Sequence, residues 1–234
     1  ELLEGGVCRQ ARLILLDSYA NAFTRDPIDP PLPWALHDQT EMRHGVGERK
    51  WEIDSLCYAV RLAHGLWKTT NSTSTFDGLW MQAAKRIVQT FREQQRFTDH
   101  GPYHFERKTL KPTGTLSLNG YGAPVKPNGL ICSGFRPSDD ACTYPFFLPA
   151  NLFAALTLDR IAEISRSVYQ DMSFAEQCVT FANQIRTVVN RCGIFEHSIH
   201  GKILAYEVDG YGSVLFMDDA NAPSLLSLPY LDSS

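Results

Sequence analysis

The sequence predicts a mostly α-helical protein, either a helix bundle or a toroid of α/α hairpins, with one small β-hairpin. Apolar residues recur at spacings of three and four over several long segments, which places them on one face of a helix. Short polar turns separate successive helical segments, an arrangement typical of helical hairpins. Strand-like residues occur in one region only, on both sides of a loop that contains glycine.

Three helices are expected in the first part of the chain, over residues 2–22, 51–70 and 76–97. A proline-rich irregular connection follows the first helix, and a short Ser/Thr turn separates the second from the third. Glu52 and Asp54 lie in the first turn of the second helix, where carboxylates favour the helix macrodipole. Helix capping is therefore one interpretation of both residues, and a functional role is the other.

A long loop over residues 98–130 separates this helical hairpin from the next one. It is rich in Gly and Pro, and long loops in compact domains usually have a function. Helices are then expected over residues 151–168 and 174–192, and the second of these has the clearest apolar stripe in the chain. The strands of the β-hairpin are expected over residues 203–208 and 213–217.

A second pair of carboxylates, Asp218 and Asp219, follows the expected hairpin. Asp219 or Asn221 is expected to cap a further helix that has Pro223 in its first turn. Capping is the simplest interpretation of these polar residues.

The composition is that of an ordinary globular protein, and one domain over residues 1–234 is expected. The 26 acidic and 22 basic residues give a net charge of -4 without like-charge runs, so no nucleic-acid partner is expected. No apolar run is long enough to cross a bilayer, so a soluble protein is expected. The six cysteines form no C-x-x-C pair and are expected to be mostly reduced, which slightly favours the cytoplasm. The Asn71 sequon points instead to secretion, so the compartment stays open.

Residues 130–151 contain an arginine and two adjacent carboxylates among aromatic and apolar residues. Three prolines exclude a regular helix here, so a shaped loop is expected. A carboxylate in apolar surroundings has a raised pKa, whereas one beside Arg136 stays ionised. Asp139 and Asp140 are thus candidates for the two protonation states that acid catalysis on a sugar requires. The alternative is structural, with Ser138 and Asp139 capping a short helical turn and Arg136 in a salt bridge.

Other reaction classes lack their motifs. The nucleophile elbow G-x-S-x-G and the phosphate signatures G-x-G-x-x-G and G-x-x-x-x-G-K-[ST] are absent, which disfavours a triad hydrolase and nucleotide chemistry. His197 and His200 are spaced like metal ligands, but Gly193 and Gly201 bracket them, so we expect a turn, no metal and no cofactor. Carboxylates, asparagines and aromatic rings suit a carbohydrate, whose C–H faces stack on rings and whose hydroxyls need donors and acceptors.

Three long stretches of the sequence resemble a known family: WEIDSLCY at residues 51–58, SGFRPSDDACTY at 133–144, and YEVDG running on to MDDANAPSLLSLPY at 206–230. They closely resemble segments of glycoside hydrolase family 125, the metal-independent exo-α-1,6-mannosidases. The resemblance implies an (α/α)6 barrel, incomplete in this chain. It also implies that an Asp acid and a Glu base hydrolyse the non-reducing-end mannose of oligosaccharides with inversion.

The resemblance places the general acid on Asp139 or Asp140, between which the sequence does not choose. The candidates for binding mannose hydroxyls are polar residues of the same three stretches: Glu52, Asp54, Arg136, Glu207, Asp209, Asp218, Asp219 and Asn221. Members of the three stretches are expected to converge at one end of the helical array.

The chain also departs from the family pattern. Ala59 stands where the family usually has Pro, and residues 145–150 replace a more usual Gly-Tyr-Leu-Ile-Pro-Ser. Neither Glu196 nor Glu207 lies in a stretch that resembles the base motif, so a fragment or shortened member is expected, with its base beyond Ser234. The expected function is an exo-α-1,6-mannosidase. The alternatives are an inactive carbohydrate-binding remnant that lacks the base and a purely structural helical domain.

Overall fold

The computed structural model describes residues 1–232, which form a mostly helical fold with small antiparallel sheets. The helices are α1 (Leu2–Leu16), α2 (Ile53–Thr70), α3 (Gly78–Glu93), α4 (Ser117–Gly120), α5 (Leu148–Ser167), α6 (Met172–Cys192) and α7 (Leu228–Asp232), with a 3-10 turn at Pro112–Gly114. The strands are β1 (Ala22–Phe23), β2 (Val46–Glu48), β3 (Phe146–Phe147), β4 (Ile194–His197), β5 (Gly201–Leu204), β6 (Glu207–Val208) and β7 (Val214–Leu215).

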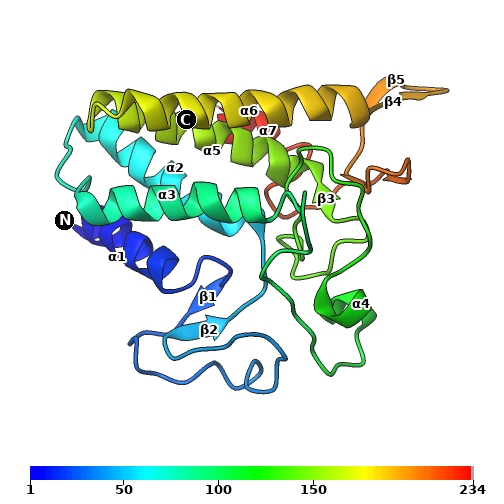
Figure 1. The fold of residues 1–234 in the computed structure, drawn as a ribbon, viewed down its shortest axis with the longest axis horizontal. Coiled ribbons are helices and arrows are strands. Elements are labelled where there is room, and N and C mark those ends of the chain that lie inside the picture. The colour runs from blue at the N-terminus through cyan, green and yellow to red at the C-terminus, as the bar shows by residue number, and fades with distance from the viewer. Residues whose placement is uncertain (233–234) are drawn as a thin grey trace.

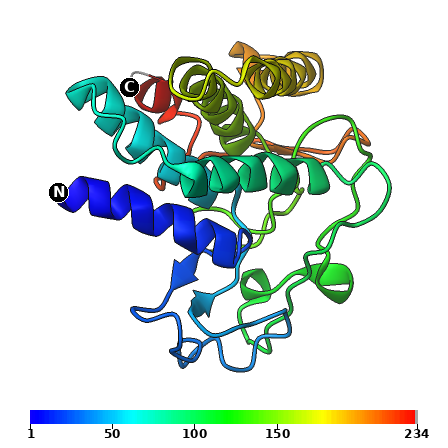
Figure 2. The ribbon, with the colours of Figure 1, turned by 60° about the vertical axis from the view of Figure 1, so that its left-hand side comes forward.

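Helix α5 lies at the centre of the helical array. Helix α6 runs along one side of it and α2 packs against another, while α3 packs chiefly against α1 (Figures 1 and 2). Side chains are buried on almost every side of α5, whereas α6 buries only a stripe from Phe174 to Val189. A helix that is apolar all round belongs inside and an amphipathic one belongs outside, so α5 is an inner helix and α6 an outer one.

Two aspartates cap the N-termini of α3 and α6. The Asp77 carboxylate accepts the backbone N–H groups of Leu79 and Trp80, both at 2.9 Å, at the start of α3. Asp171 accepts the N–H of Phe174 at 3.0 Å at the start of α6. Each carboxylate satisfies helix N–H groups that have no partner within the helix, which fixes where these helices begin.

The end predicted for the first helix and the predicted β-hairpin need correction. The first helix ends at Leu16 and does not reach residue 22, because Asp17 is extended and residues 22–23 pair with β2. The expected hairpin is found only in part: β6 pairs with β7, but β5 pairs with β4. β6 also pairs with β3, which makes a three-stranded sheet. The turn predicted around His200 is confirmed and forms the tip of the β4–β5 hairpin.

The helix predicted to contain Pro223 in its first turn is wrong. Residues 220–227 form bends and turns, and the next helix is α7. The Asp218 carboxylate accepts the N–H groups of Leu225 at 2.8 Å and Leu226 at 3.1 Å. Asp218 therefore closes a turn, because a short acidic side chain binds nearby backbone as well outside a helix as at its start.

Trp51 joins the start of α2 to the loop of residues 131–147, which precedes α5. Its indole N–H donates to the Cys132 carbonyl at 2.6 Å, and its own carbonyl accepts from Gly134 at 3.1 Å and Phe135 at 3.0 Å. Trp51 is buried, and buried hydrogen bonds are costly to break. The N-terminal ends of the inner helices α2 and α5 are thereby held at the same end of the array.

Two expectations from composition concerned the cysteines, expected to be mostly reduced, and the absence of an apolar segment long enough to cross a bilayer. All six cysteines are free thiols, and four of them are buried. No helix within residues 1–232 is both long and apolar enough to cross a membrane.

Candidate active site

Two carboxyl groups lie at the start of α2, largely removed from water. Glu52 is the N-cap residue, but its side chain makes no capping bond and accepts a hydrogen bond from Ser55 Oγ at 3.0 Å. Asp54 is buried, and its Oδ1 has no hydrogen-bond partner among residues 1–232. Simple capping therefore does not account for Glu52, and an unpartnered buried oxygen at Asp54 calls for a functional explanation.

The environment favours the protonated form of both carboxyl groups. Burial raises the pKa of Asp54 to about 7, against a hydrogen bond from its own backbone. Burial also raises the pKa of Glu52 well above its usual value, and the charge of Asp54 raises it further. Ser55 opposes this shift and Asp139 adds to it. Asp139 thus belongs to the same electrostatic cluster as the two residues of α2.

Asp139 stands at the tip of a tight hairpin. Phe135 and Ala141 form a bridge at its base, the Arg136 N–H donates to the Asp140 carbonyl at 2.8 Å, and the Asp139 N–H donates to the Arg136 carbonyl at 2.9 Å. Asp139 has a φ of 64°, in the left-handed region that is uncommon for residues other than glycine. Such strain often accompanies function, and no helical turn forms here for Asp139 to cap.

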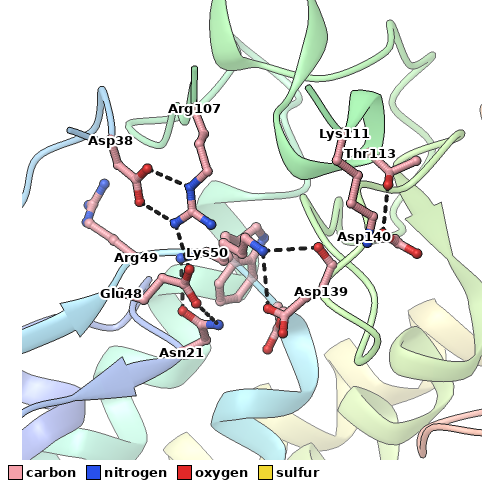
Figure 3. Close-up of polar contacts among 12 residues, drawn as sticks. Asn21, Asp38, Glu48, Arg49, Lys50, Arg107, Lys111, Thr113, Asp139 and Asp140 are labelled. Carbon is pink, nitrogen blue, oxygen red and sulfur yellow. Dashed lines mark hydrogen bonds and ion pairs between the residues drawn. The ribbon is translucent and has the colours of Figure 1, made fainter. Parts of the chain in front are cut away.

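Lys50 holds this hairpin tip. Its buried Nζ donates to the backbone carbonyl of Asp139 at 3.1 Å and to the Asp139 carboxylate at 3.3 Å (Figure 3). The ammonium also lies 5.0 Å from the centre of the Phe135 ring, a cation–π distance. The side chain of Asp139 remains 58% exposed, so it is anchored without being covered.

Asp140 is turned away from this cluster. Its Oδ1 contacts Lys111 Nζ at 2.5 Å and accepts a hydrogen bond from Thr113 at 2.7 Å (Figure 3). Partial burial opposes ionisation of Asp140, but the hydrogen bonds from Lys111 and Thr113 outweigh it and hold the pKa below its usual value. The adjacent aspartates therefore point to different partners and occupy different environments.

A charged network braces the segment that carries Lys50. Arg107 binds Asp38 through two hydrogen bonds of 2.7 and 2.6 Å and reaches Glu48 at 2.6 Å (Figure 3). Glu48 accepts from Asn21 at 3.2 Å, and Asn21 in turn accepts the Lys50 N–H at 3.0 Å. Bidentate arginine pairs have a fixed geometry, so this network sets the position of the backbone just before Glu52.

Arg136 is paired with Glu207 on strand β6. Arg136 Nε donates to Glu207 Oε1 at 2.6 Å, and the second oxygen of Glu207 accepts the N–H of Tyr144 at 3.0 Å. Glu207 is fully buried, and Arg136 Nη2 is used on Thr143 at 3.3 Å. Both oxygens of Glu207 are thus occupied, and its contacts position Arg136 and the loop that precedes α5.

The remaining predicted site residues lie in turns. Asp209 Oδ1 accepts three backbone N–H groups of the turn that follows β6, at 2.8–3.1 Å. Asp219 accepts hydrogen bonds from Asn221 and from Ser138, and although partial burial opposes it, these donors hold its pKa below the usual value. The Ser138 contact brings Asp219 to the Asp139 hairpin, whereas Asp218 closes the turn described above.

Two hydrogen bonds join the three stretches. The Phe135 N–H donates to the Trp51 carbonyl at 3.0 Å, and Arg136 Nε donates to Glu207 at 2.6 Å. The structure therefore brings members of all three stretches together at the N-terminal ends of α2 and α5. Within residues 1–232, no group of three or more His, Cys, Asp or Glu side chains is arranged to hold a metal ion.

Comparison with known proteins identifies the family. A family model described as metal-independent alpha-mannosidase (GH125) matches residues 1–234. The chain belongs to this family. The predicted fold class is thereby confirmed, because GH125 proteins are (α/α)6 barrels and the inner and outer helices follow that plan.

Two known proteins illustrate the similarity. The meiotically up-regulated gene 157 protein of Schizosaccharomyces pombe is 38% identical over 250 residues, which covers 98% of this chain and 48% of that protein. A Streptococcus pneumoniae metal-independent α-mannosidase, solved as a non-productive complex with α-1,6-mannobiose, matches with a TM-score of 0.92 at 37% identity. That match covers 98% of this chain and 54% of the other. This GH125 chain thus spans about half the length of these two relatives.

Sequence reasoning missed two lysines of this GH125 site, Lys50 and Lys111. Lys50 directly precedes the WEIDSLCY stretch, so its place beside a matched motif was a signal that it lies near the site. Lys111 lies in the long loop between α3 and β3, and no local pattern links it to Asp140.

Proposed function

We propose that the protein containing this chain is an exo-α-1,6-mannosidase, which removes the non-reducing-end mannose of oligosaccharides with inversion and uses Asp139 as general acid. The observation that carries the proposal is the contrast between the two aspartates. The side chain of Asp139 is 58% exposed beside the Glu52–Asp54 cluster, whereas that of Asp140 is 29% exposed and is turned to Lys111 and Thr113. A general acid must reach the glycosidic oxygen and carry a proton there.

The neighbouring groups suit the hydroxyls of a mannose unit. Burial raises the pKa of both Glu52 and Asp54, and the protonated form of either carboxyl group can donate as well as accept a hydrogen bond. Arg136 uses Nε and Nη2 within the protein, which leaves Nη1 to donate to a sugar oxygen. Asp219 lies beside the same hairpin and offers a further acceptor.

The α-1,6 linkage is the choice that the relatives support. The pneumococcal protein was solved with α-1,6-mannobiose and comes from work on the processing of N-linked glycans. A terminal α-1,6-linked mannose is therefore proposed as the unit that this protein removes.

The test uses the full-length protein, because the matched relatives are about twice as long as this chain. Mannobioses with α-1,6, α-1,3 and α-1,2 linkages are incubated separately, and proton NMR follows the anomer released first. We expect cleavage of the α-1,6 isomer with β-mannose as the first product. Release of α-mannose would contradict inversion, and preference for another isomer would contradict the linkage. Binding of every isomer without cleavage would favour the carbohydrate-binding remnant instead.

A further inference from the structure

A cavity lies outside the candidate active site, among the loops at the same end of the helical array. Its volume is about 580 Å³, and it is lined by residues 96–100, 118–119, 121–125 and 127 and by Tyr211. This volume falls within the range of about 300–1,000 Å³ typical of small-molecule sites. The name loop cavity is used for it below.

Exposed aromatic rings line the loop cavity. Phe97 is 58% exposed and Tyr211 is 66% exposed, although both are large and apolar over most of their surface. Tyr121 is held in place by His100, with ring centres 4.9 Å apart. Rings exposed on opposite segments of a cavity offer apolar faces to a ligand, which would remove them from water.

Three uncharged polar side chains of the loop cavity are available to bind a ligand. Within residues 1–232 no hydrogen bond is made by the side-chain amide of Asn119 or by the hydroxyls of Tyr121 and Tyr211, so these groups can donate to and accept from a ligand. Arg96 is buried, and its guanidinium is already bound to Gln94 at 3.2 Å and to the Tyr121 carbonyl at 2.9 Å.

The charge pattern selects between ligand classes. Besides Arg96 and His100, the acidic or basic side chain among the described residues that line the loop cavity is Asp99, whose carboxylate accepts the N–H of Gly101 at 2.7 Å. An anionic ligand such as a phosphorylated sugar would meet this carboxylate without a free cation to balance it. A neutral ligand with apolar faces and a rim of hydroxyls fits the lining, and a pyranose has both features.

The backbone around the loop cavity is strained where it forms the wall. Arg96, Leu118 and Asn119 all have φ between 51° and 56°, a region that side-chain-bearing residues rarely adopt. Such strain persists where the surrounding structure or a function requires it.

Strand β6 connects the loop cavity to the candidate active site. Tyr211 belongs to the turn that follows β6, and the Lys126 N–H in the cavity loop donates to the Asp209 carbonyl of that turn at 2.9 Å. Glu207, two residues before Asp209 on β6, holds Arg136. Figure 1 shows the loop between α3 and β3 and the segment after β5 on the same side of the molecule.

We propose that the loop cavity binds a neutral pyranose unit of a mannose-containing oligosaccharide, as a second carbohydrate site beside the catalytic one. The choice of a mannose-containing ligand rests on the proposed function. The bound unit comes either from the remote part of the chain being cleaved or from a separate oligosaccharide, and both sources present the same chemistry to the rings.

The test compares three variants of the full-length protein: Phe97→Ala, Tyr211→Ala and the control Trp34→Ala. Trp34 is 62% exposed and lies outside the loop cavity, so the control removes an aromatic side chain of similar exposure. Titration calorimetry measures the Kd and stoichiometry for α-1,6-linked mannotriose and for methyl α-mannoside, under conditions where released mannose is not detected. Circular dichroism checks that each variant is folded.

Each cavity variant is expected to weaken mannotriose binding by about 3- to 10-fold, the effect of losing one aromatic contact, while Trp34→Ala leaves it unchanged. If the unit belongs to the chain being cleaved, the Kd for methyl α-mannoside stays constant. If it belongs to a separate chain, methyl α-mannoside binds at two sites in the unaltered protein and at one in the variants. Unchanged Kd and stoichiometry for both sugars would overturn the inference, even if hydrolysis is normal. Absence of hydrolysis with the expected loss of binding would overturn only the proposed function.

Discussion

Lys50 donates two hydrogen bonds to Asp139, one to its backbone carbonyl at 3.1 Å and one to its carboxylate at 3.3 Å. A single buried ammonium therefore fixes both the position of the hairpin tip and the direction of the proposed acid. The network of Arg107, Glu48 and Asn21 fixes Lys50 in turn. The position of the proposed acid thus depends on residues outside the three matched stretches.

Replacing Lys50 tests this dependence. We expect Lys50→Met to lower the kcat of the full-length enzyme on α-1,6-mannobiose by about 10- to 100-fold, because a displacement of about 1 Å costs up to 100-fold. Lys111→Met is the matched control, since it frees Asp140 instead, and it should change kcat little. A larger effect at Lys111 than at Lys50 would contradict the assignment. Comparing kcat and KM separates positioning from loss of sugar binding.

The two aspartates differ in their expected dependence on the leaving group. We expect Asp139→Asn to reduce hydrolysis of mannobiose by about 10²- to 10⁴-fold, the usual contribution of a general acid. The loss should be much smaller with a dinitrophenyl mannoside, whose leaving group needs no proton. Asp140→Asn should not show this contrast, because its hydrogen bonds to Lys111 and Thr113 are structural. An equal loss on both substrates for Asp139→Asn would assign it to binding only.

The Asp54 carboxyl predicts a pH dependence of stability. Its pKa rises from 3.8 to about 7 on folding, so the folded state keeps a proton that the unfolded chain releases. The free energy of unfolding should therefore fall as pH rises from about 4 to about 7. Asp54→Asn should remove this fall and stabilise the protein by about 1–3 kcal/mol at pH 8, with little effect near pH 4.

Urea unfolding at pH 4.5 and pH 8 measures this effect. The exposed Asp26 serves as the control, because Asp26→Asn removes a carboxylate without a buried environment. A variant Asp54→Asn that follows the same pH profile as the unaltered protein would show that this carboxyl is ionised when folded.

The buried pair of Arg136 and Glu207 should be strongly coupled. We expect Arg136→Met and Glu207→Gln each to lower the free energy of unfolding by about 3–5 kcal/mol, because each leaves a buried charge without its partner. The double variant should lose less than the sum. The exposed pair of Lys68 and Glu163, 2.8 Å apart, is the control, and Lys68→Met should cost less than about 1 kcal/mol. Additive losses at Arg136 and Glu207 would contradict the coupling.

Periodicity predicted the long helices well, because burial of an apolar stripe decides where a helix forms. The stripe from Phe174 to Val189 is the clearest case. The β4–β5 hairpin was missed because its short strands alternate weakly and are partly exposed. Asp219 was expected to cap a helix, but it accepts the N–H of Asn221 in a turn, because carboxylates bind backbone N–H groups in turns as readily as at helix starts.

The sequence predicted which residues belong to the candidate site, but it did not predict which partners their side chains contact. The resemblance supplied Asp139 and Asp140 as one pair, and only the fold shows that Lys50 binds one and Lys111 the other. These partners come from segments far from residue 139 in sequence, so no local pattern contains them. The pKa of Asp54 likewise depends on burial by distant elements, which residue types alone do not reveal.

The hydrogen bonds of Trp51 to Cys132 and Phe135 affect how the protein folds during translation, because they join residues far apart in the sequence. At about 5–20 residues per second, translation from Trp51 to Phe135 takes on the order of ten seconds, and until then α2 has no loop to cover its first turn. Asp54 therefore spends this interval in water as an anion. When the loop closes over α2, burial raises the pKa of Asp54 to about 7, so at neutral pH a part of the nascent chains takes up a proton at this carboxyl.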